Sequence, residues 1–147
     1  MGATTFRPGV PAPVIGLDEA RKDSHMGRAP YRLPDTLAAS LERAFAGEVA
    51  ERLPRLLAAT DKLTETTEAA GQVMSDAHAL ASSAAVVGAD MAAHAARECE
   101  ALLAPYAGTR AVPFAVAQQA TVAAEQMRDA LAAWATWAQN RTRAESA

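Results

Sequence analysis

The chain has 147 residues, of which 50% are hydrophobic but only 5% aromatic, and alanine is abundant. Because alanine is the best helix former and strands favour β-branched and aromatic residues, this composition predicts an all-α fold. The formal net charge is −3, and no stripe of Lys and Arg follows any predicted helix, which argues against nucleic acid as a partner.

Residues 1–33 are interrupted by prolines and glycines, so no continuous helix is expected there. We interpret them as a flexible terminal segment; the alternative is an arm that binds a partner through Val14, Ile15 and Leu17. The segment lacks the apolar core of a signal peptide, and no stretch of the chain approaches the roughly 20 apolar residues of a membrane span. We therefore expect a cytoplasmic protein without membrane contact.

Two helices are predicted next, separated by Gly47. The first is short: it begins at Asp35, a suitable N-cap, and carries Leu37, Leu41 and Phe45 at a spacing of four.

The second predicted helix covers residues 48–64, with Pro54 in its early turns, where proline costs least. The expected inner stripe consists of Val49, Leu53, Leu56, Thr60 and Leu63. The residues expected to face solvent are Glu51, Arg52, Arg55, Asp61 and Lys62.

A third helix is predicted over residues 68–87, and Gly88 suits its C-terminal stop. The fourth is predicted over residues 91–104, with Asp90 as its cap and Pro105 ending it.

The last predicted helix begins near Pro113, a residue favoured at the first helical position, and frays from Asn140 onward. Its apolar seam consists of Phe114, Ala117, Ala120, Ala124, Met127, Leu131, Trp134 and Ala138. Because short connections make successive helices antiparallel, this order predicts an up-down-up-down four-helix bundle with an additional short N-terminal helix. We place the bundle at residues 34–140 and a frayed tail at residues 141–147.

One histidine lies on an unusual face of the third predicted helix. The buried stripe of that helix consists of Val73, Ala77, Leu80, Ala84 and Val87, and His78 projects from roughly the opposite side. Its neighbours one or two turns away are Gly71, Ser75, Ser82 and Ala85, none of which is larger than serine. This strip is either a bare surface of an Ala-rich helix or a path along which another protein reaches the imidazole.

The residues around His78 resemble the signature of histidine-containing phosphotransfer (HPt) domains, which reads roughly H-x-L-K-G-S-[SA], then G-[AS], then a helix ending in L-E. The matching residues are His78, Leu80, Ser83, Ala84, Gly88 and Ala89, and Cys99-Glu100 falls where the L-E would be. The run from Glu51 to Leu57 also resembles the equivalent helix of the family. Two positions depart from the signature: the usual Lys is Ala81 and the usual Gly is Ser82.

The resemblance implies that His78 carries a phosphoryl group, which it accepts from the phospho-aspartate of one receiver domain and passes to another. The implied docking surface for the receiver consists of Gly71, Ser75, Ala81, Ser82 and Ala85. In this family the Mg²⁺ and the acidic pocket belong to the receiver, so we expect this chain, as a monomer, to bind no metal or cofactor. Ala81 lacks the positive charge of the usual Lys, and Ser82 could either crowd the approach or donate a hydrogen bond to the phosphate.

Two other functions remain open: an adaptor that docks receiver domains without phosphotransfer, favoured by Ala81 and Ser82, and a purely structural helical scaffold. No ATP-binding pattern is present, so a kinase activity of its own is excluded. A metal site made of His94, Glu98 and Cys99 matches no zinc spacing. We expect instead that His94 pairs with Glu98 and that the single cysteine is a small buried hydrophobe, without a disulfide or a thiolate metal cage.

Overall fold

The computed structural model describes residues 34–108 and 110–146. The expectations for residues 1–33, including the partner-binding arm, lie outside the described residues. The chain divides into two units, Met1–Leu37 and Ala38–Ala147, and the helical bundle belongs to the second. The described residues form helices and connections with no strand, so the predicted all-α fold class is confirmed.

The first described helix, α2, spans Asp35–Thr60 without interruption. The predicted break at Gly47 is therefore wrong, and the residues expected to form a separate short helix are the first turns of α2. A helical glycine costs only about 1 kcal/mol relative to alanine. Packing on both sides offsets this cost, because Phe45 before the glycine and Leu56 after it are both buried in the core.

The third and fourth helices lie close to their predicted positions. Helix α3 spans Glu68–Val86 and α4 spans Asp90–Leu103, followed by the 3-10 turn η2 at Ala104–Tyr106. Gly88, in the turn between α3 and α4, has a φ of 79°, a conformation that glycine adopts at little cost. The expected cap differs, because Ala89 occupies the N-cap position of α4 and Asp90 is already helical.

The last helix, α5, spans Phe114–Ser146 and is longer than predicted. It continues past Asn140, where we expected the chain to fray. Arg141 on this extension forms an ion pair with Glu42 of α2, and its guanidinium lies 4.6 Å from the ring centroid of Trp137. These contacts give the last two turns partners that the sequence pattern did not reveal.

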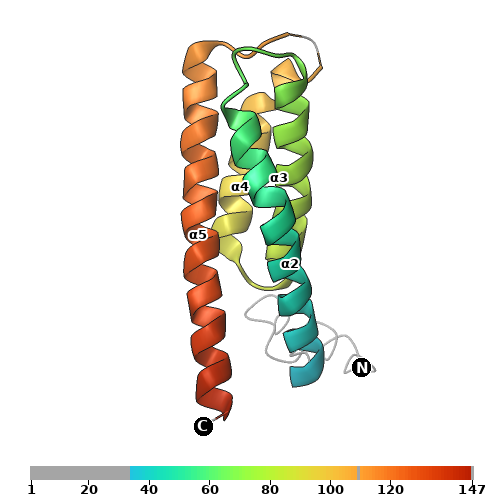
Figure 1. The fold of residues 1–147 in the computed structure, drawn as a ribbon, viewed down its shortest axis with the longest axis vertical. Helices are drawn as coiled ribbons and strands as arrows, with labels where there is room; N and C mark the ends of the chain where they lie inside the picture. Colours follow the sequence, from blue (N-terminus) through green and yellow to red (C-terminus); the bar gives the residue numbers. More distant parts are fainter. Residues whose placement is uncertain (1–33, 109, 147) are drawn as a thin grey trace, which may run out of the picture. The chain divides into compact units, whose positions relative to one another are not determined.

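Figure 1 shows α2 and α4 running in one direction and α3 and α5 in the other. Small side chains dominate the core between them, and alanines let neighbouring helices approach closely. The largest fully buried apolar residues are Leu56, Leu63, Leu80, Leu103, Met127 and Val73. Trp134 packs edge-on against Phe45, with ring centroids 5.1 Å apart. No helix among residues 34–108 and 110–146 has the length and apolarity needed to span a membrane.

Candidate functional site

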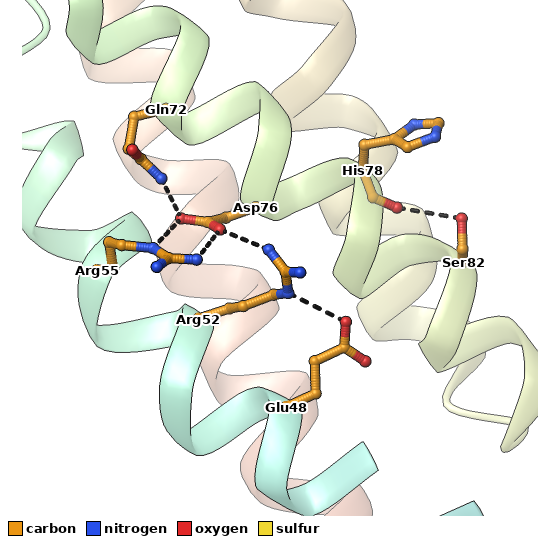
Figure 2. Close-up of polar contacts among 7 residues, drawn as sticks. All are labelled: Glu48, Arg52, Arg55, Gln72, Asp76, His78 and Ser82. Carbon is orange, nitrogen blue, oxygen red and sulfur yellow. Dashed lines mark hydrogen bonds and ion pairs between the residues drawn. The ribbon is translucent and has the colours of Figure 1, made fainter. Parts of the chain in front are cut away.

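His78 stands near the middle of α3 with 72% of its side chain exposed. The four small residues predicted to surround it on this face, Gly71, Ser75, Ser82 and Ala85, are all exposed. Figure 2 shows the imidazole on the side of α3 away from the buried carboxylate of Asp76. The helix therefore presents the ring to solvent beside these four small residues, with half-buried Met74 one turn before it.

A residue on the neighbouring helix contacts the ring. The Nδ1 atom of His78 lies 2.9 Å from Oε2 of Glu100 on α4. Because a carboxylate only accepts hydrogen bonds, the neutral ring must carry its proton on Nδ1 to make this contact. The Nε2 atom then keeps its lone pair.

The sequence reasoning did not identify this pair. Its signal was present in the resemblance, since Glu100 occupies the last position of the family signature. However, 22 residues separate the two side chains, and only the packing of α4 against α3 brings them together.

Ala81, assigned to the docking surface, is only 3% exposed and belongs to the hydrophobic core. This part of the predicted site is wrong. Ala81 lies one turn after His78 but about 60° round the helix axis toward the buried side of α3, whereas exposed Ser75 lies about 60° to the other side. The exposed members of the predicted docking surface are therefore the four residues Gly71, Ser75, Ser82 and Ala85.

The hydroxyl of Ser82 donates a hydrogen bond to the backbone carbonyl of His78 over 3.1 Å, as Figure 2 shows. Serine side chains in helices commonly bond to the carbonyl four residues earlier. The hydroxyl is thereby held against the helix backbone, below the ring.

A polar cluster lies on another side of α3, around Asp76 (Figure 2). Arg55 donates to both carboxylate oxygens over 3.0 and 2.8 Å, and Arg52 donates to Oδ1 over 3.0 Å. Gln72 donates to Oδ2 over 2.8 Å, while Glu48 accepts a further bond from Arg52 over 3.1 Å. The two arginines were expected to face solvent. Arg55 is exposed, as predicted, and Arg52 is half-buried, but both guanidinium groups also contact a buried carboxylate, which the sequence did not predict.

Burial and hydrogen bonding act in opposite directions on Asp76. Burial of this fully inaccessible side chain acts to raise its pKa, but the hydrogen bonds from Arg55, Gln72 and Arg52 outweigh it and hold the pKa below its usual range. The carboxylate is thus charged at neutral pH and ties α2 to α3 two residues before His78. These bonds connect α3, the helix that carries the histidine, to α2.

The alternative metal site is not assembled. Cys99 is fully buried, as expected, whereas His94 and Glu98 are exposed. Burial raises the pKa of the Cys99 thiol to about 11. Among residues 34–108 and 110–146, no group of three His, Cys, Asp or Glu side chains could hold a metal ion.

The sequence matches the family model of the Hpt domain over residues 40–137. Searches of curated proteins and of solved structures found no match to this chain. Because the family match covers well over half of the chain, the protein belongs to the Hpt domain family. Hpt domains have a phosphotransfer role in two-component signalling and interact with receiver domains, and this is the general role of the protein.

Proposed function

We propose that the protein is a phosphorelay intermediate: Nε2 of His78 accepts a phosphoryl group from the phospho-aspartate of one receiver domain and later returns it to the aspartate of another. The observation that supports this most directly is the exposed imidazole whose Nδ1 is paired with Glu100. Such a ring is a nucleophile with its free lone pair directed away from its partner carboxylate.

In the forward step the Nε2 lone pair forms a bond to phosphorus. The bond between phosphorus and the aspartyl oxygen breaks, and the aspartate leaves as a carboxylate with the electron pair. The proton on Nδ1 stays in place, so the phosphorylated ring is cationic beside the negative charge of Glu100. Glu100 therefore both selects the nucleophilic nitrogen and stabilises the positive charge that develops on the ring.

The remaining requirements of the reaction fall on the partner. Phosphoryl transfer depends mainly on positioning and on stabilising charge, and the Mg²⁺ and acidic pocket are expected on the receiver. This chain contributes a nucleophile on a helix held by the Asp76 cluster, with small residues that leave room for the receiver. One chain holds the whole proposed site, so a monomer suffices.

A docking adaptor without phosphotransfer is the second candidate. The observation that favours it is the absence of any Lys or Arg on α3, including position 81, where the family usually has Lys. Such a protein would bind receivers through the same strip without accepting the phosphoryl group.

One experiment separates the two. The protein is incubated with a phosphorylated receiver domain and Mg²⁺, and acid-labile, base-stable phosphate is measured on wild type and on His78→Gln. Phosphate on wild type alone supports the relay. Receiver binding without transfer contradicts the relay and supports the adaptor, and neither binding nor transfer leaves only the structural scaffold.

A further inference from the structure

We propose that Arg97 on α4 supplies the positive charge that contacts the phosphoryl group on His78. This inference rests on the proposed phosphotransfer function. It assigns to the neighbouring helix a role that no cation on the histidine's own helix can fill.

The distribution of charge around the site is uneven. Helix α3 contains no Lys or Arg, and α4 contains a single one, Arg97. Arg52 and Arg55 of α2 are both bound to Asp76. A phosphoryl group on nitrogen carries close to two negative charges at neutral pH. A nearby positive side chain that is not already paired would therefore stabilise the phosphorylated histidine.

The register of the two helices places Arg97 beside the site. The contact between His78 and Glu100 aligns the antiparallel helices α3 and α4 at those residues. Three residues before Glu100 on α4 lies Arg97, and three residues after His78 on α3 lies Ala81, so the two residues are level with one another. Arg97 is three residues, about 4.5 Å of helical rise, from the residue whose carboxylate holds the ring.

The side chain of Arg97 is available for this role. It is exposed, and it makes no hydrogen bond or ion pair with another residue in the described part of the chain. Glu100, its neighbour at i+3, is already engaged by His78. A guanidinium can donate two parallel hydrogen bonds to phosphate oxygens, which an ammonium cannot do with the same geometry. Buried Ala81 beside it leaves space above the helix interface for the long side chain.

The test uses phosphoramidate as a small phosphoryl donor, so that no receiver is needed. His78 Nε2 bonds to phosphorus as the P–N bond breaks and ammonia leaves. The probe is the full chain as wild type, Arg97→Gln and Arg97→Lys, with Arg143→Gln in the last turn of α5 as a matched control that removes an equal charge elsewhere.

Two quantities are measured by ³¹P NMR: the rate of phosphorylation and the pKa of the phosphoryl group from its shift against pH. In Arg97→Gln we expect the rate to fall about fivefold and the phosphoryl pKa to rise by about half a unit, because the dianion loses a neighbouring positive charge. Arg97→Lys should reverse most of this rise in the phosphoryl pKa. Arg143→Gln should have the same rate and the same phosphoryl pKa as wild type. Melting temperatures should be the same for all four proteins, since Arg97 makes no structural contact.

Equal rates and pKa values for wild type and Arg97→Gln would overturn the inference while leaving the proposed function intact. A phosphoryl pKa in Arg97→Lys as high as in Arg97→Gln would also overturn the inference, because lysine restores the positive charge and should therefore lower that pKa again. If wild type itself acquires no phosphohistidine, the proposed function fails first and this inference with it.

Discussion

At the scale of single residues, the proposed reaction depends on the contact between His78 and Glu100, which would determine which ring nitrogen can react. In water the neutral imidazole of histidine favours the proton on Nε2, which would block the nitrogen furthest from the backbone. A carboxylate at Nδ1 reverses that preference. In the proposed relay, a residue on another helix thus prepares the nucleophile, and the small residues beside it only keep the approach open.

The first prediction concerns this preference. In Glu100→Ala the ratio of Nδ1–H to Nε2–H tautomers should fall about tenfold, since a hydrogen bond to a charged group contributes about 1.5 kcal/mol. The measurement is ¹⁵N NMR of the His78 ring at a pH where it is neutral. Glu98→Ala, an exposed neighbour on the same helix, should leave the ratio unchanged; an unchanged ratio in Glu100→Ala would show that the contact has no influence on the ring.

The second prediction concerns Asp76. Asp76→Asn should lower the free energy of unfolding by about 2 kcal/mol at pH 7, because charged hydrogen bonds from Arg52 and Arg55 are lost. Since the folded pKa of Asp76 lies below its unfolded value of about 3.9, its stabilisation is present above pH 4 and is lost as the pH falls below it. The difference between the two proteins should therefore shrink on acidification.

Denaturant unfolding at several pH values provides the measurement. The matched control is Asp129→Asn, which removes an exposed ion pair with Arg128 and should cost less than about 0.5 kcal/mol. A difference between wild type and Asp76→Asn that grows toward low pH would contradict the assignment of a lowered pKa.

The same cluster shows why part of the site could not be predicted from the sequence. The helical period placed Arg52 and Arg55 on the outer face of their helix, and Asp76 attracted no attention because a carboxylate near the edge of an apolar stripe is common. The bond between them depends on how α2 is rotated against α3, which is a tertiary property. The exposed strip around His78, by contrast, follows from residues of one helix, and the period alone was enough to find it.

At the scale of elements, local signals predicted helix ends well where a backbone requirement was involved. Gly88 ends α3 with a positive φ, and Pro105 lies two residues after the last residue of α4. The local signals failed at Gly47, where the backbone does not need the left-handed conformation and the helix continues through the glycine. A glycine predicts a helix end only when the fold uses its left-handed conformation, and the sequence does not distinguish the two cases.

The third prediction uses this difference. Gly47→Ala should raise the free energy of unfolding by about 0.5–1 kcal/mol, because the new Cβ meets nothing within 4 Å and the unfolded chain loses freedom. Gly88→Ala should lower it by about 1 kcal/mol, since its φ of 79° strains an L-residue. Thermal unfolding of the two variants checks the opposite signs; a stabilising Gly88→Ala would contradict the observed turn.

At the scale of the whole molecule, composition and helical periodicity were sufficient for the fold class, and the motif around His78 was sufficient for the family. Contacts between distant segments could not be obtained that way. The ion pair between Arg141 and Glu42 joins residues 99 positions apart, and it occurs on a stretch that the sequence pattern, with its seam ending near Ala138, marked as a frayed end.

The fourth prediction tests that stretch. A chain ending at Asn140 should melt several degrees lower than the full chain, since loss of the Glu42 ion pair and of the stacking on Trp137 together costs about 1 kcal/mol. A chain ending at Thr142, which keeps Arg141, is the matched control and should melt near the full chain. Equal melting of the two truncated proteins would restore the original expectation of a frayed tail.

The central claim is that His78 is an accessible nucleophile that reacts through Nε2. The most direct measurement is to phosphorylate the protein with phosphoramidate and to locate the phosphate by ¹H–¹⁵N correlation and ³¹P coupling in the histidine rings. We expect a single phosphohistidine, at Nε2 of His78, with the proton retained on Nδ1. Phosphate on Nδ1 of His78, on His94 or on His25, with the Nε2 of His78 unmodified, would contradict the claim.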